Sequence, residues 1–285
     1  MTERIANQKL RGKIMSAAEA AEFIGHGAKI GMSGFTGAAY PKEMPTAIAE
    51  RAKEAHARGV EFAIDLYTGA STAPDCDGVL AEADALRFRM PYQSDPIMRK
   101  KINAGEMKYA DMHLSHSSQQ VSEGFFGDLD FAIVEAARIT EEGHIVPSSG
   151  VGNNVEYLDA ADKIIIEVNS WQSVDLEGMA DIYRVQARPN RTAIPINNPG
   201  DRVGTTYIDI DTDKVVAVIE TDFPDRNSAF KPIDDVSRRP PGLRQLRNAV
   251  RRRQRAQRRD GGPAGLQVRE YPGLHRGHPG RHGRP

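Results

Sequence analysis

Hydrophobic residues form short runs that alternate with segments of helical composition along the first two thirds of the chain. The runs are rich in β-branched residues and almost continuous, which is typical of strands buried on both faces of a sheet. We expect strands at residues 28–32, 60–69, 109–115, 129–136, 162–169 and 213–221. We expect helices at residues 13–25, 41–58, 78–86 and 95–105. The alternation predicts an α/β fold with a mainly parallel sheet and flanking helices.

Capping signals set the ends of the first predicted helix. Ser16 and Glu19 have the spacing of a capping box, and Gly25 or Gly27 is suited to end the helix. The single cysteine of the 285-residue chain excludes an intramolecular disulfide. No N-terminal run has the form of a signal peptide, and none approaches the ~20 apolar residues of a membrane span. We therefore expect a soluble cytoplasmic protein.

The Gly-rich stretch GMSGFTG follows the first predicted strand and places Gly31, Gly34 and Gly37 three apart. Such a loop can bring backbone amides close to an anionic group at a helix N-terminus. Its spacing is not the GxGxxG of dinucleotide sites, so an NAD-linked dehydrogenase is not expected. On spacing alone, a plain tight turn is favoured over a ligand-binding loop.

Two clusters have metal-like spacing, but neither has a full set of ligands. His113 and His116 stand three apart with no second cluster to complete a site. The acidic residues of Asp209–Asp213, with Glu220, follow calcium-loop spacing, but Lys214 occupies the sixth position, where that loop requires glycine. We expect structural histidines and a polar turn.

Two other residues are candidates for a catalytic or binding role. Cys76 is flanked by acidic residues, which raise a thiol pKa and oppose nucleophilic reactivity. Arg226 follows the last predicted strand, and a guanidinium is suited to bidentate binding of a carboxylate. Spacing alone favours a surface ion pair with Asp222 or Asp225.

Six stretches, considered together, carry more information than any single motif. They are SGFTGAAYPKEMP, DMHLSHSSQQV, LDFAIVEAARITEEGHIVPSSGVGNN, YLDAADKIIIEVN, LEGMADIY and DTDKVVAVIETDFPDRNSAFKPIDDVS. In this order they resemble the N-terminal half of the acetyl-CoA hydrolase/transferase family, of the succinyl-CoA:acetate and propionyl-CoA:succinate CoA-transferase type. The resemblance covers residues 8–237.

The resemblance implies an enzyme that moves coenzyme A between carboxylic acids. In such enzymes a glutamate attacks the acyl-CoA thioester, giving an acyl-glutamyl anhydride and then a glutamyl-CoA thioester. Acetyl-CoA hydrolysis is the related reaction in which water replaces the acceptor acid. The implied partners are acyl-CoA and small carboxylic acids, with coenzyme A as a substrate and no permanently bound cofactor. The full-length protein is expected to be a homodimer, without a membrane or nucleic-acid partner.

The resemblance also implies which residues of this half contribute to the substrate pocket. They are Gly34, Thr36, Gly37, Ser71 and Thr72. Arg226 of PDRN would pair with the substrate carboxylate. The nucleophilic glutamate and most CoA-binding loops belong to the second half of the family, so no catalytic residue is assigned here and the chain is expected to be inactive alone.

Residues 238–285 differ sharply in composition from the rest. They contain 14 Arg and two acidic residues, whereas residues 1–237 contain 24 basic and 37 acidic residues. A body of charge −13 is thus joined to a tail of charge +12. A tail so poor in apolar residues cannot offset its ordering entropy. We expect a domain at 1–237 and a disordered Arg/Gly/Pro-rich tail at 238–285.

The tail has two interpretations. Back-translated with permitted codons and shifted by one nucleotide, residues 249–263 give QSGVGNVPNAVMAGL and residues 274–282 give YTEVIQDG. These resemble the Gly-rich loop and the catalytic-glutamate segment of the family's second half, which favours a frame shift near residues 237–239. The alternative is a nonspecific nucleic-acid-binding arm, because an Arg-rich segment binds phosphates by releasing counterions.

The gene sequence tests the frame-shift interpretation. We expect the third bases of the codons for residues 249–263 and 274–282 to encode these two segments in the shifted frame. Third bases that encode other residues there would contradict it.

Overall fold

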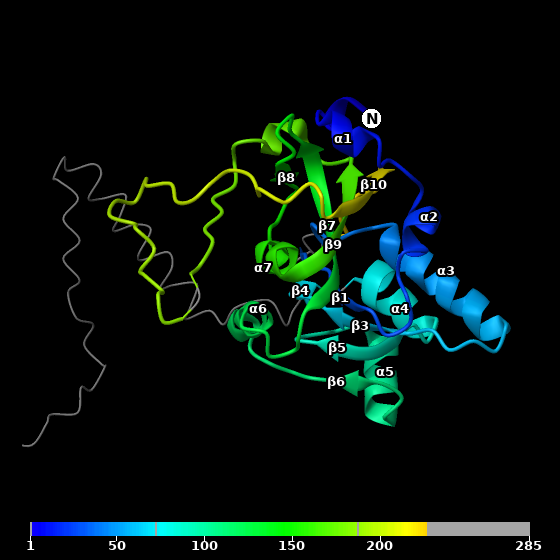
Figure 1. Cartoon of the computed structure of the whole chain (residues 1–285). Coiled ribbons are helices and arrows are strands. Elements are labelled where there is room, and N and C mark those ends of the chain that lie inside the picture. Colours follow the sequence, from blue (N-terminus) through cyan, green and yellow to red (C-terminus); the bar gives the residue numbers. More distant parts are fainter. Residues whose placement is uncertain (1, 72, 187, 227–285) are drawn as a thin grey trace, which may run out of the picture. The chain divides into compact units, whose positions relative to one another are not determined.

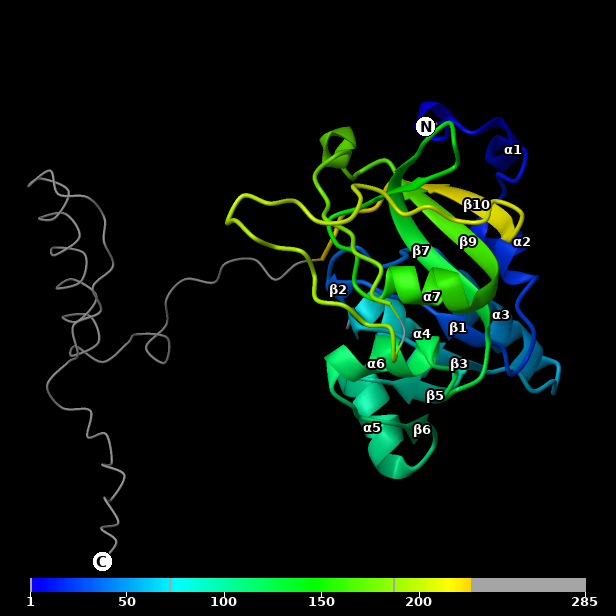
Figure 2. The same ribbon diagram turned by 60° about the vertical axis from the view of Figure 1, so that its left-hand side comes forward.

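The computed structural model of the chain describes residues 2–71, 73–186 and 188–226. Thr72, the predicted boundary at residue 237 and the predicted tail lie outside the described residues, so the predictions about the tail stay predictions. Within the described part, a mainly parallel sheet has helices on both faces, which confirms the predicted α/β class (Figures 1 and 2).

The main sheet has its strands in the order β10-β9-β7-β1-β3-β5-β6, and β8 pairs with β7. The bounds are β1 (Lys29–Gly31), β3 (Ile64–Tyr67), β5 (Leu86–Met90), β6 (Lys108–Tyr109), β7 (Leu129–Ile139), β8 (Ile145–Pro147), β9 (Ala161–Asn169) and β10 (Val215–Thr221). The pairs along this order are parallel, and only the β7–β8 pair is antiparallel. The carboxyl ends of the parallel strands therefore share one edge.

Helices cover both faces of the main sheet. One face of the sheet is covered by α2 (Ala17–Ala21), α3 (Met44–Ala57), α4 (Val79–Glu82) and α5 (Pro96–Ala104). The other face is covered by α1 (Gln8–Arg11), α6 (Leu114–Ser122) and α7 (Asn154–Ala160). The remaining elements are β2 (Phe35–Thr36), β4 (Ala70–Ser71), η1 (Thr2–Arg4), η2 (Pro74–Gly78) and η3 (Val174–Leu176).

Side chains along β7 alternate between two hydrophobic cores. Phe131 and Ile133 pack in the core under α2 to α5, whereas Ala132 and Val134 pack in the core under α6 and α7. Successive strand residues point to opposite faces, so both faces of this strand are buried. This explains why the strand sequences are almost continuously apolar.

Two predicted elements differ from the structure. The helix expected at 78–86 is present but shorter, since α4 covers Val79–Glu82 and the strand β5 begins at Leu86. The arginines of this strand concealed its pattern, since Arg89 is buried in an ion pair with Asp77. The strand expected at 109–115 is mostly wrong, because β6 ends at Tyr109 and α6 begins at Leu114.

The capping box is confirmed, although its helix is shorter than expected. The Ser16 hydroxyl accepts from the Glu19 backbone N–H at 3.2 Å, and the Glu19 carboxylate accepts from the Ser16 backbone N–H at 2.9 Å. The helix ends at Ala21, ahead of Gly25. None of the helices in the described part of the chain combines the length and apolar character that a bilayer crossing requires.

Candidate active site

The candidate site lies at the carboxyl edge of the parallel strands. The chain leaves β1 to form β3 on one side of it, and later returns to place β7 on the other side. Ligands of open α/β sheets bind at such a switch point. The Gly-rich loop that follows β1 begins at this point.

The Gly-rich loop has a strained backbone conformation. A Cβ on Gly34 would lie 2.6 Å from the Ala38 carbonyl oxygen, so the loop requires glycine there. Thr36 and Ala39 adopt positive φ angles of 51° and 56°. Such angles persist in residues other than glycine only where the surroundings fix them, and they cluster at functional sites.

The structure brings most of the predicted pocket residues to one place. Thr36 of β2 pairs in register with Ser71 of β4. The Arg226 backbone N–H donates to the Gly37 carbonyl at 2.7 Å, which attaches the segment after β10 to the loop. Thr36 is exposed, whereas Gly34 and Gly37 are buried.

A buried lysine joins this loop to two other segments. The Lys42 ammonium lies 2.8 Å from a Glu135 carboxylate oxygen on β7 and 3.0 Å from an Asp225 carboxylate oxygen. It also donates to the Tyr40 carbonyl at 2.6 Å. The Lys42, Glu135 and Asp225 side chains are only 3%, 0% and 4% exposed. Each of these charges is therefore paired away from water.

Amide and hydroxyl donors satisfy the remaining carboxylate oxygens. Gln172 donates to Glu135 at 3.2 Å and to Asp225 at 3.1 Å, and Asn169 donates to Glu135 at 2.7 Å. Ser149 donates to Asp225 at 2.7 Å. Burial alone would raise the pKa of Asp225, but these bonds and the Lys42 charge outweigh it and keep the pKa below its ordinary value. We call Lys42, Glu135, Asp225 and their donors the Lys42 network.

A carboxylate from β9 caps the helix that follows the loop. Glu167 accepts backbone N–H bonds from Lys42 at 2.6 Å, Glu43 at 3.1 Å and Met44 at 2.6 Å, at the start of α3. The first N–H groups of a helix lack partners within it, and the helix dipole favours an anion there. Burial raises the pKa of Glu167 to about 7, against the opposing effect of the three N–H donors.

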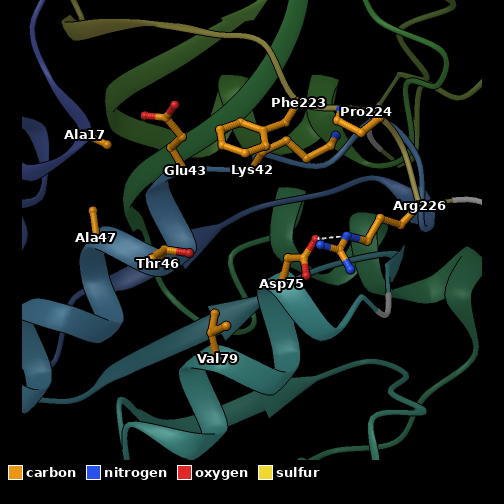
Figure 3. A pocket seen from close by; sticks show the side chains of 10 residues that line it. All are labelled: Ala17, Lys42, Glu43, Thr46, Ala47, Asp75, Val79, Phe223, Pro224 and Arg226. Carbon is orange, nitrogen blue, oxygen red and sulfur yellow. Dashed lines mark ion pairs between the residues drawn. The ribbon is translucent and has the colours of Figure 1, made fainter. Parts of the chain in front are cut away.

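A pocket of about 480 Å³ opens beside this network (Figure 3). Its lining consists of Ala17, Lys42, Glu43, Thr46, Ala47, Asp75, Val79, Phe223, Pro224 and Arg226. Arg226 and Asp75 form an ion pair across one side, with 2.5 Å between Nε and Oδ2, and Figure 3 shows the two side chains pointing toward each other. Apolar walls next to a guanidinium are suited to a short-chain carboxylate.

Among the predicted site residues whose side chains the structure describes, only Arg226 lines this pocket. Gly34, Thr36 and Gly37 are not among its lining residues, and nothing is described for Thr72. The surface-pair interpretation of Arg226 named the wrong acids, because its partner is Asp75 and Asp225 pairs with Lys42 instead.

Sequence reasoning missed the Lys42 network. The sequence did show Glu135 and Glu167 as charged residues within mostly apolar strands, and this pattern could have indicated buried carboxylates. The predicted strand placed Glu135 at its end, but β7 continues to Ile139 and Glu135 is 1% exposed in its interior. A buried charge in a strand requires a partner, and the sequence alone did not indicate Lys42.

The other candidate residues are buried or lie in surface ion pairs. Cys76 is 2% exposed, and burial, with a further contribution from Asp77, raises the pKa of its thiol. Asp209 pairs with Arg184, and Asp213 pairs with Lys9. In the described part of the chain, no three His, Cys, Asp or Glu side chains gather closely enough to hold a metal ion.

The model of the acetyl-CoA hydrolase/transferase N-terminal domain family matches residues 2–220. The chain belongs to this family. It is 45% identical over 235 residues to succinyl-CoA:acetate CoA-transferase of Clostridium kluyveri, covering 82% of this chain and 43% of that protein. It is 46% identical over 211 residues to propanoyl-CoA:succinate CoA transferase of Escherichia coli, covering 74% and 43%.

Family members differ in their named activity. An acetyl-CoA hydrolase of Schizosaccharomyces pombe is 36% identical over 244 residues, covering 83% of this chain and 46% of that protein. The chain thus spans less than half the length of these relatives. Among solved structures, RipA from Yersinia pestis shares the fold with a TM-score of 0.55 at 18% identity, covering 80% of this chain and 46% of that one.

The pH dependence of stability tests the Glu167 cap. The Glu167 pKa of about 7 in the folded chain lies above the ordinary 4.5. Between these pH values, the folded chain therefore keeps a proton on Glu167 that the unfolded chain has lost. The stabilisation from this group is therefore complete below about pH 4.5 and declines up to pH 7, by about 3 kcal/mol in all. Glu167→Gln removes the titration, so the wild type's free energy of unfolding minus the variant's should decrease from pH 5 to pH 7.

Urea unfolding of the 285-residue chain at several pH values measures this difference. Glu54→Gln is the control for loss of a carboxylate, because Glu54 is an exposed position on α3, the helix that Glu167 caps. A difference for Glu167→Gln that stays constant or grows with pH contradicts the assigned titration.

Proposed function

We propose that this domain is the carboxylate-recognising half of an acyl-CoA:carboxylate CoA-transferase. Coenzyme A is its substrate, exchanged between small carboxylic acids such as acetate, propionate and succinate, with acetyl-CoA hydrolysis as the related activity. What supports the proposal is the Arg226 guanidinium on the wall of an apolar-sided pocket at the carboxyl edge of the sheet. The named activities of the relatives agree with it.

In the proposal, the Lys42 network fixes the segment that carries Arg226. Asp225 is buried against Lys42, and the next backbone N–H donates to Gly37. The guanidinium is thereby aimed at the pocket, where it would hold the substrate carboxylate through paired N–H bonds. Gly34, Thr36, Gly37, Ser71 and Thr72 would line the route to this position from the Gly-rich loop.

The proposal assigns the nucleophilic glutamate to the other half of the family's fold. In the family mechanism that carboxylate displaces the CoA thiolate from the acyl-CoA thioester and forms an acyl-glutamyl anhydride, from which CoA then displaces the acid to give a glutamyl-CoA thioester. Glu135 and Glu167 are 1% and 0% exposed and already accept hydrogen bonds, which opposes an attack on a substrate. The complete enzyme would join both halves, and a second copy of that full-length protein is the proposed partner.

Arg226→Gln tests the recognition of carboxylate. A lost charge-assisted contact is worth about 1.5–3 kcal/mol, so the variant should bind propionate at least about tenfold more weakly. Titration followed by saturation-transfer NMR gives the dissociation constants. Arg202→Gln is the matched control, since Arg202 is 53% exposed, against 62% for Arg226, and pairs with Asp181 outside the pocket. Equal propionate binding by wild type and Arg226→Gln would refute the proposed role.

An assay of CoA transfer from succinyl-CoA to acetate tests the assignment of the nucleophile. The purified 285-residue chain should show no turnover, because no pocket-facing nucleophile is assigned to it. Turnover would overturn that assignment. If Glu43→Gln then abolished the turnover, Glu43, the glutamate that lines the pocket, would be identified as the nucleophile.

A further inference from the structure

The guanidinium of Arg226 is already occupied by a carboxylate of the chain itself. Its Nε lies 2.5 Å from Oδ2 of Asp75, and both residues line the pocket (Figure 3). Among the described residues, Asp75 is the only ion-pair partner of Arg226. A carboxylate that binds the Nε edge of this guanidinium must therefore compete with Asp75.

The two ends of Arg226 are held very differently. Its backbone N–H is bonded to Gly37, and the preceding residue, Asp225, is buried in the Lys42 network with a side-chain exposure of 4%. The Arg226 side chain, in contrast, is 62% exposed, and the side chain of its partner Asp75 is 30% exposed. An exposed ion pair contributes little free energy, so the side chain can exchange partners while its backbone stays in place.

Asp75 differs from a neighbouring carboxylate, Asp77, which is fully buried in an ion pair. Asp77, two residues after Asp75 in η2, forms an ion pair with Arg89 in which both side chains are 0% exposed. Asp75 has a second donor, the Tyr40 hydroxyl at 3.3 Å. Burial first, and then the charge of Asp75, raise the pKa of Tyr40, so this hydroxyl keeps its proton and remains a donor. Asp75 would therefore retain a partner after losing Arg226.

We propose that Asp75 is an internal competitor for the carboxylate-binding guanidinium of Arg226 and thereby sets the affinity of the pocket for small monocarboxylates. The inference rests on the proposed function of Arg226. Only the fraction of the chain with a released guanidinium is competent to bind, so the apparent dissociation constant equals the intrinsic constant divided by that fraction. Ligand binding and the internal ion pair exclude each other.

Competition and orientation predict opposite effects of the same substitution. If Asp75 only held Arg226 in a productive direction, then removing its charge would weaken the binding of a carboxylate. If Asp75 competes, Asp75→Asn should tighten binding. From the usual strength of exposed ion pairs, the expected gain is about two- to fivefold in the dissociation constant.

The experiment is a titration of the 285-residue chain with propionate at low ionic strength, followed by saturation-transfer NMR. It compares wild type, Asp75→Asn, Asp181→Asn and Arg226→Gln, with urea unfolding of each variant to confirm folding. Asp181 forms an exposed ion pair with Arg202 outside the pocket, so Asp181→Asn controls for the loss of one carboxylate charge from an arginine pair. We expect tighter binding in Asp75→Asn alone.

Each other outcome has a distinct meaning. If Arg226→Gln weakens propionate binding, then unchanged or weaker binding in Asp75→Asn, or equal tightening in Asp181→Asn, overturns the competitor role. Propionate binding that survives in Arg226→Gln, or that is absent from all four proteins, refutes the proposed function of Arg226 and with it the inference.

Discussion

The buried ammonium group of Lys42 holds together three segments that are far apart in the sequence: the Gly-rich loop, β7 through Glu135, and the segment after β10 through Asp225. Losing one member of such a buried pair typically costs about 3–5 kcal/mol, because the remaining charges are left unpaired away from water. Amide donors from Asn169 and Gln172 complete the set of bonds. The geometry of the pocket therefore depends on this one cation.

The site has a part that the Lys42 network holds in place and a part in which we propose that an ion pair exchanges partners. The fixed part includes the strained Gly-rich loop, whose positive φ angles require rigid surroundings, and the start of α3, which Glu167 caps from β9. The part that we propose to be exchangeable is the more exposed pair between Arg226 and Asp75. A site that binds and releases many small carboxylates needs both, since a rigid base orients the guanidinium and a weak internal pair leaves it accessible.

Patterns that depend on neighbouring residues could be predicted from the sequence. The apolar runs predicted β7, β9 and β10, and the Ser16–Glu19 spacing predicted its capping box. Interactions between distant residues could not be predicted in the same way. The Lys42–Glu135 pair joins positions 93 residues apart, and only the packing of β7 beside β1 brings them together. The strand β5 was missed for a related reason, because a buried Arg89 resembles a surface residue until Asp77 is placed against it.

The most direct test of this account is a crystal structure of the chain with 3-bromopropionate, located by the anomalous signal of bromine. The account predicts the carboxylate within hydrogen-bonding distance of the Arg226 guanidinium, with Asp75 displaced and the Lys42 contacts to Glu135 and Asp225 unchanged. A bound carboxylate elsewhere, or one that leaves the Asp75–Arg226 pair intact, would contradict it.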